Sequence, residues 1–204
     1  MPPRTQRQTN RRADAPHSRE DVVELGKLFD RSPPHSAEAE KVVLGSLLLD
    51  NRRIDDVALV LKPEHFYAPG YRTIYEAILA LHDAGKQAEP VLLAERLKDR
   101  GDLEMIGGME TLVDLLESMP VATNAVHYAT IVRDKFVQRN LLAASVETIR
   151  DVWDMAGEED NAVKQLVERA EARVMLVSED RAGDQVTEIS ETLGALLEMI
   201  NNAG

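Results

Sequence analysis

Apolar residues recur every three or four positions through most of the chain, which is the spacing of helices with one buried face. The most apolar of these helices is expected to begin at Ser36. Two prolines, Pro33 and Pro34, disfavour helix up to that point, and the serine hydroxyl suits the first free N–H groups. Apolar residues cover more than half of the helix circumference up to Asp50, so we predict a buried central helix.

Several shorter helices are expected between Ile54 and Pro120, each with its own apolar stripe. Lys62-Pro63, Gly85, Gly101 and Gly107-Gly108 interrupt the stripes, and such residues end or begin helices. No segment has a convincing strand pattern. The sequence therefore predicts an all-α fold that starts with a compact globular bundle.

The second half of the chain has longer helical patterns. One runs from Asn124 to Gly157, and we expect a break near Gln138–Asn140 because the pattern exceeds the usual length of a globular helix. An acidic turn at Glu158–Asn161 then leads into a further helix, which makes an antiparallel helical hairpin. A lone hairpin buries one side of each helix, so leftover apolar residues such as Trp153 favour pairing with a second copy.

The two ends of the chain differ from the middle. Residues 1–32 are expected to form a disordered, arginine-rich arm. A polar linker precedes a last helix whose heptad-like stripe calls for a groove on a partner. The predicted organisation is an arm at 1–32, a globular helical domain at 33–123, a long helix and hairpin at 124–178, a flexible linker at 179–185 and a linker helix at 186–204.

Composition narrows the function classes. The 204 residues carry a net charge of −12, and the first twenty hold five arginines, so the body is more acidic than the total. An acidic body repels phosphate backbones, which disfavours general nucleic-acid binding by the folded part. The chain has no cysteine, which excludes disulfides and fits a cytoplasmic location. No apolar run approaches the roughly 18 residues that a membrane helix needs.

Residues that could carry chemistry are few. No phosphate-binding glycine loop with a following lysine is present, and the five histidines lack metal-ligand spacing. Glu38, Glu40 and the pair Asp55-Asp56 are expected to be solvated or to favour a helix start, because adjacent or alternate residues do not share a helix face. We therefore expect no catalytic, cofactor-binding or metal residues, and we favour an assembly module.

An ordered series of short motifs runs from Pro33 to about Asn201. It comprises PPHSAEAEKVVLGSLLLDN, DDV (55–57), HFY (65–67), LLAERLKDRG (92–101), IGG (106–108), P-x-x-x-N (120–124), YATIVR (128–133) and AEARV (170–174). Each piece is weak alone, but the ordered set resembles the N-terminal part of a DnaB-type replicative DNA helicase. Residues before Pro33 carry no usable resemblance.

The resemblance implies a specific assembly. In that family the globular domain and hairpin form a collar on a hexameric ring built from dimers, and the collar offers a platform for primase. The pairing hairpin corresponds to 141–156 and 161–177. We place its interface at Leu142, Ile149, Trp153, Val163, Leu166, Val167, Ala170 and Val174. The linker helix is expected to dock on the adjacent subunit's RecA-like motor domain through Val186, Ile189, Leu193, Leu196, Leu197 and Ile200.

The chain stops at Gly204, where the motor of such a helicase would begin. ATP, Mg²⁺ and unwinding are therefore expected of the motor, and no cofactor is expected in this segment. The alternative is a stand-alone helical adaptor that resembles the helicase-binding domain of primase, which the linker helix argues against. A small DNA-binding regulator would need a basic recognition helix, and none is present.

Overall fold

The computed structural model describes residues 31–117, 124–155 and 161–178. Chain contacts divide the molecule into two units, Met1–Pro33 and Pro34–Gly204, and nearly all described residues belong to the second. Every regular element in the described residues is a helix, so the predicted all-α class is confirmed. The predicted linker at 179–185, the linker helix at 186–204 and almost all of the arm lie outside the described residues.

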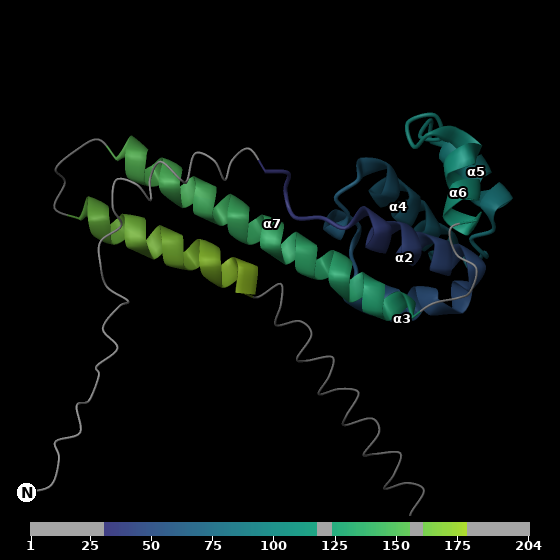
Figure 1. The fold of residues 1–204 in the computed structure, drawn as a ribbon, viewed down its shortest axis with the longest axis horizontal. Coiled ribbons are helices and arrows are strands. Elements are labelled where there is room, and N and C mark those ends of the chain that lie inside the picture. The colour runs from purple at the N-terminus through teal and green to yellow at the C-terminus, as the bar shows by residue number, and fades with distance from the viewer. Residues whose placement is uncertain (1–30, 118–123, 156–160, 179–204) are drawn as a thin grey trace, which may run out of the picture. The chain divides into compact units, whose positions relative to one another are not determined.

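The central element is α2 (Ala37–Leu49), which begins where the sequence predicts. The Ser36 side chain accepts a hydrogen bond from the backbone N–H of Ala39 at 3.2 Å, which caps the first turn. Val43, Leu44 and Leu47 have no exposed surface. Helix α2 packs against α4, α6 and α7, so the prediction of a buried central helix is confirmed (Figure 1).

Short helices surround α2, and their ends follow local signals. They are η1 (Asn51–Arg53), α3 (Ile54–Val60), η2 (Pro63–His65), α4 (Pro69–Asp83), α5 (Pro90–Asp99) and α6 (Gly108–Glu117). Pro63, Pro69 and Pro90 each occupy the first position of a helix, where their missing N–H is not needed. The core they enclose is aliphatic except for Phe66 and the fully buried Tyr75, whose hydroxyl donates to the Leu61 carbonyl at 3.0 Å.

The long helix α7 (Ala125–Asp154) is continuous over 30 residues, so the predicted break near Gln138–Asn140 is wrong. Polar residues alone do not interrupt a helix, and this stretch has no glycine or proline. Asn124 caps the start, as predicted, by accepting from the backbone N–H of His127 at 3.3 Å. Ala125, Ala129 and Val132 are fully buried against the globular core.

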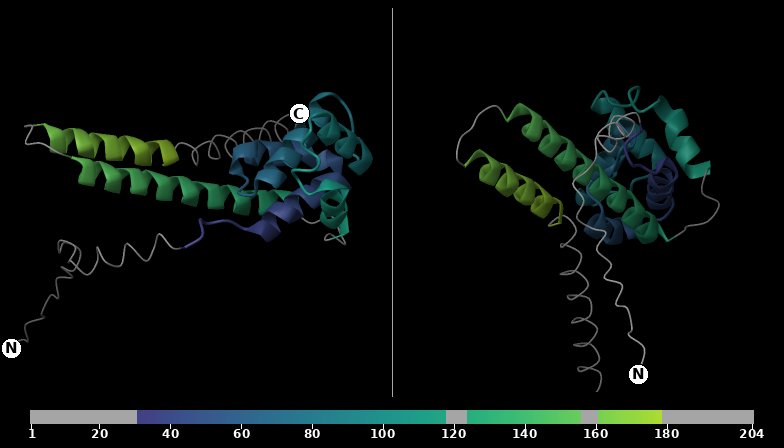
Figure 2. Two further views of the ribbon diagram at one scale, coloured as in Figure 1. Left: turned by 90° about the horizontal axis from the view of Figure 1, so that it is seen from above. Right: turned by 60° about the vertical axis from the view of Figure 1, so that its left-hand side comes forward.

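A further helix spans 162–178 and runs antiparallel to the second half of α7, as Figures 1 and 2 both show. Together they form the hairpin that the sequence predicts. The first half of α7 belongs to the globular core and the second half to the hairpin. One rigid helix therefore connects the two parts.

Candidate assembly surface on the helical hairpin

Arg139 fastens the middle of α7 to the globular core. Its guanidinium donates to the Pro34 carbonyl at 2.9 Å and to the His65 carbonyl at 2.6 Å. The guanidinium also lies 5.5 Å from the ring centroid of Tyr67 and 5.6 Å from that of Phe136, within the range of cation–π attraction. Burial lowers the pKa of Arg139 from its ordinary value. These contacts fix the point from which the hairpin projects.

Glu40 secures the same junction from the other side. It is 2% exposed, and its two carboxylate oxygens accept from the backbone N–H groups of Tyr67 at 2.9 Å and Ala68 at 3.2 Å. Ala68 is the N-cap of α4 and makes no side-chain cap of its own, so Glu40 supplies the acceptor and the negative charge that this helix start favours. The expectation that Glu40 is solvated is therefore wrong.

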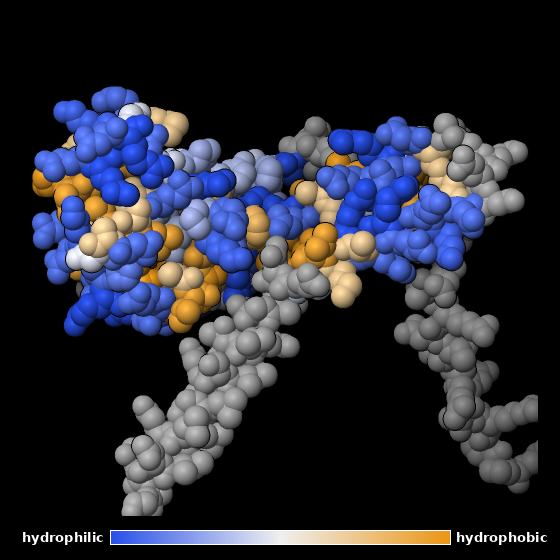
Figure 3. Space-filling model, turned by 180° about the vertical axis from the view of Figure 1, so that it is seen from behind, coloured by the Kyte–Doolittle hydropathy of each residue, from blue (hydrophilic) through white to orange (hydrophobic). Residues whose placement is uncertain are grey.

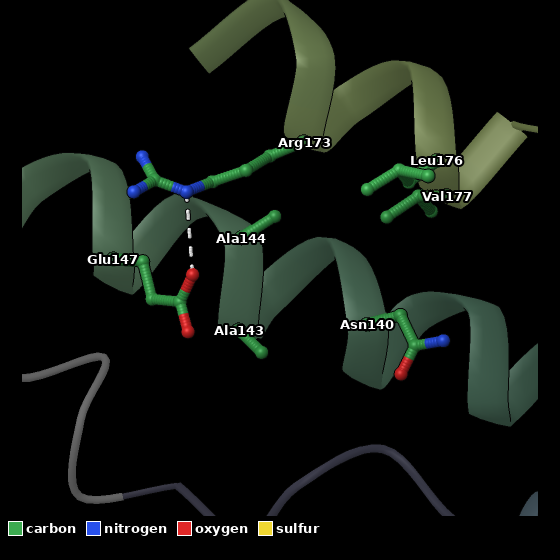
Figure 4. Close-up of a pocket in the computed structure, with 7 residues that line it drawn as sticks. All are labelled: Asn140, Ala143, Ala144, Glu147, Arg173, Leu176 and Val177. Atoms are coloured by element: carbon green, nitrogen blue, oxygen red, sulfur yellow. Dashed lines mark ion pairs between the residues drawn. The ribbon is translucent and has the colours of Figure 1, made fainter. Parts of the chain in front are cut away.

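Ion pairs hold the hairpin together along its seam, which is the line of contact between α7 and helix 162–178. Arg173 donates to Asp151 at 2.7 Å and lies 3.3 Å from Glu147, the pair drawn in Figure 4. Arg169 lies 3.5 Å from Asp151. The hydrogen bond from Arg173 lowers the pKa of the Asp151 carboxyl from its ordinary value. The seam is thus largely polar, and the buried Ala144 permits the close approach.

A shallow cavity of about 240 Å³ lies along the seam. Figure 4 shows its lining, which comprises Asn140, Ala143, Ala144 and Glu147 of α7 with Arg173, Leu176 and Val177 of helix 162–178. Small side chains on α7 leave the space open. No carboxylate pair or histidine lines it, so the residues present offer contact surface and no catalytic group.

Helix α7 carries three distinct stripes in the hairpin, and the seam fixes their directions. The seam stripe is Asn140, Ala144, Glu147 and Asp151, with spacing four, three, four. Because 3.6 residues make one turn, each single-residue step rotates the direction by about 100°. A stripe shifted by one residue therefore lies about 100° from the seam, and one shifted by two lies about 200° away.

The stripe shifted by one residue continues onto the second helix. On α7 it is Leu141, Ser145, Thr148 and Val152. On helix 162–178, Val163, Val167 and Val174 each follow a seam-facing position by one residue. Because the two helices are antiparallel, the same shift on each leads to the same side of the hairpin. These seven residues, named here the hairpin face, contain no charge.

The stripe shifted by two residues is Leu142, Val146, Ile149 and Trp153, named here the back stripe. It lies on α7 alone and points away from helix 162–178. Trp153 is 75% exposed, the highest value among the large apolar residues of the described chain. Figure 3 shows apolar residues at the surface of the hairpin and of the globular part, set among hydrophilic ones.

The predicted interface residues do not lie on one surface. Val163, Val167 and Val174 are on the hairpin face, whereas Leu142, Ile149 and Trp153 are on the back stripe. Leu166 and Ala170 are half-buried toward α7. Sequence reasoning missed Leu141 and Val152, which are 46% and 51% exposed. Each directly precedes a residue that was chosen, so the signal was present with the helix phase shifted by one position. The predicted docking residues between Val186 and Ile200 lie outside the described residues.

Two searches of the described residues complete the site description. No group of three or more histidine, cysteine, aspartate or glutamate side chains is arranged there to hold a metal ion. No helix among them is long and apolar enough to span a membrane.

Comparison with known proteins places the fold and the sequence in one family. Residues 32–134 match the family model of the DnaB-like helicase N terminal domain. The chain is 36% identical over 180 residues to the replicative DNA helicase DnaB of Mycobacterium leprae, covering 88% of this chain and 30% of that protein. It is 32% identical over 166 residues to the replicative DNA helicase DnaC of Bacillus subtilis, covering 81% and 36%. The chain therefore spans about a third of the length of these relatives.

Two solved structures are similar to the whole described fold. The crystal structure of the N-terminal domain of DnaB helicase from Mycobacterium tuberculosis has a TM-score of 0.65 and 38% identity, and the match covers 71% of this chain and 99% of that one. A structure of a DnaB-like replicative helicase, reported with its interactions with primase, has a TM-score of 0.54 and 25% identity, covering 75% and 34%.

Proposed function

Because the chain belongs to the family of DnaB-like helicase N-terminal domains, we propose that it is the non-catalytic collar region of a bacterial replicative DNA helicase. The family assignment confirms the resemblance carried by the ordered motifs. In this role the chain pairs with further copies, promotes assembly of the hexameric ring and offers a docking platform for primase during DNA replication in the bacterial cytoplasm.

The observation that carries the assembly role is the hairpin face. Val163, Val167, Leu141 and Val152 are each between 46% and 63% exposed, and no charged residue interrupts them. Exposed contiguous apolar surface on a helical hairpin marks an interaction site, because burying it removes apolar area from water. A second hairpin completes a four-helix bundle and covers that surface.

The primase role is supported by the relative whose structure was reported with its interactions with primase. That structure matches three quarters of this chain. The collar then acts by bringing primase to the ring. The linker helix at 186–204 docks on the adjacent subunit's RecA-like motor domain in this proposal, and ATP and Mg²⁺ are handled by that motor.

Two measurements test the proposal on the 204-residue chain. Light scattering over a wide concentration range should give dimers or larger assemblies, and a monomer at the highest concentration would refute the assembly role. Calorimetric titration with primase from the same bacterium should show saturable binding. Primase without its helicase-binding domain is the control, and equal binding of the two would refute docking. ATP hydrolysis that co-purified with the chain would contradict the non-catalytic assignment.

A further inference from the structure

We propose that the hairpin pairs with a second copy through the hairpin face, with Leu141 and Val152 of α7 and Val167 of helix 162–178 in the contact and Trp153 outside it. This inference rests on the proposed assembly role and specifies its surface. It differs from the sequence expectation, which places Trp153 in the interface. By exposed area alone Trp153 would be the first choice, since it is 75% exposed and Val167 is 50% exposed.

Bundle geometry selects the hairpin face. In a four-helix bundle each helix contacts two neighbours, so its two contact stripes lie roughly 90° apart. On α7 the hairpin face lies about 100° from the seam, and the matching residues of helix 162–178 lie on the same side. The back stripe lies about 200° from the seam on α7 and has no counterpart on helix 162–178. A second hairpin can bury both helices only through the hairpin face.

The chemistry of the hairpin face suits pairing between identical chains. A symmetric contact places the same residues on both sides, so any charge in it meets its own copy. The chain carries a net charge of −12, yet the seven residues of the face include no charged one. Two copies therefore meet there without direct like-charge repulsion.

The two hydroxyl residues of the face do not oppose burial. Ser145 donates to the Leu141 carbonyl at 2.8 Å, and Thr148 donates to the Ala144 carbonyl at 2.8 Å. Their donors are therefore already satisfied within α7, which removes the main cost of taking a hydroxyl out of water. Both side chains are small, so a partner helix can approach α7 closely at the middle of the face.

The experiment compares Val167→Asp with Trp153→Asp in the full 204-residue chain, using sedimentation equilibrium to measure the dimer dissociation constant. Val167→Asp should weaken pairing at least about tenfold, because it places a carboxylate in a contact that holds no cation. Trp153→Asp should leave the dissociation constant within about twofold of the wild type. Val152→Asp is a second variant on the face and should behave like Val167→Asp. These positions are exposed, so circular dichroism should show unchanged helix content.

The single tryptophan gives an independent readout in the unmodified chain. If Trp153 stays outside the contact, its emission maximum should be the same above and below the dissociation constant. A blue shift on association, or loss of pairing in Trp153→Asp with pairing kept in Val167→Asp, would overturn the inference and leave the assembly role standing. A wild-type chain that stays monomeric at every concentration would overturn both.

Discussion

Glu40 and Tyr67 are joined by a buried hydrogen bond in which the Tyr67 backbone N–H donates to the carboxylate at 2.9 Å. The second oxygen of Glu40 accepts from Ala68, so one side chain satisfies two N–H groups at the start of α4. A buried carboxylate without these partners would be costly, and so would the two N–H groups without the carboxylate. Glu40 thus makes the start of α4 depend on α2.

Replacing Glu40 with glutamine tests this dependence. The amide removes the charge and offers one acceptor in place of two, so Glu40→Gln should lower the free energy of unfolding by about 2 kcal/mol. Glu38→Gln is the matched control, since Glu38 lies in the same first turn of α2 and is exposed. Urea denaturation followed by circular dichroism measures both. Equal effects of the two variants would contradict the buried role of Glu40.

Arg139 should be intolerant of lysine. Lysine keeps the charge but lacks the planar fork that reaches the carbonyls of Pro34 and His65 together. Arg139→Lys should lower the free energy of unfolding by about 1.5 kcal/mol or more, the net value of hydrogen bonds to a charged group.

Arg150→Lys, at an exposed position of the same helix, is the control for Arg139→Lys and should change the free energy of unfolding by less than about 0.5 kcal/mol. Chemical denaturation gives both values. A stability of Arg139→Lys indistinguishable from that of Arg150→Lys would show that the two carbonyl contacts do not stabilise the junction.

The Asp151 carboxyl makes hairpin stability depend on pH in a defined direction. Its pKa is lowered in the folded chain by the hydrogen bond from Arg173, so folding favours the ionised form. The stabilisation is fully present above the unfolded pKa of about 3.9 and is lost as the pH falls through the lower folded value. Asp151→Asn should therefore melt below the wild type at neutral pH, and the difference should shrink below about pH 4. A difference independent of pH would contradict the ion pair.

Local signals made much of the fold predictable. A helix start depends on its nearest residues, so Ser36, Pro90 and Asn124 could be identified from the sequence as beginning helices. Glu40 and Arg139 could not be assigned in this way. Glu40 meets its partner 27 positions along the chain, and Arg139 meets one of its partners 105 positions away. Nothing in the sequence near either residue marks those contacts.

The assembly surface was only partly predictable for a different reason. Leu141-Leu142 and Val152-Trp153 are adjacent apolar pairs, so two helix phases fit the same sequence pattern. The choice between them depends on which side of α7 meets helix 162–178. The ion pairs of Arg173 with Glu147 and Asp151 decide it, and polar contacts of that kind leave no hydrophobic periodicity to read.

Gly107 should be the least replaceable of the glycines that end helices in the globular part. Its φ is +96°, and an added Cβ would lie 2.5 Å from the Thr111 hydroxyl oxygen, which donates to the Ile106 carbonyl at 2.9 Å. Gly101 has a φ of +77° and open space around it. Gly101→Ala should cost about 1 kcal/mol of unfolding free energy from the left-handed backbone alone, and Gly107→Ala roughly twice that.

The clash between Gly107→Ala and the hydroxyl of Thr111 can be separated from the backbone cost. In a Thr111→Ala background the obstructing oxygen is gone, so the further cost of Gly107→Ala should fall to about that of Gly101→Ala, close to 1 kcal/mol. Urea denaturation of the four variants in this cycle, with Gly101→Ala alongside, measures the coupling. Purely additive costs would mean that Thr111 moves away freely and that backbone conformation alone requires the glycine.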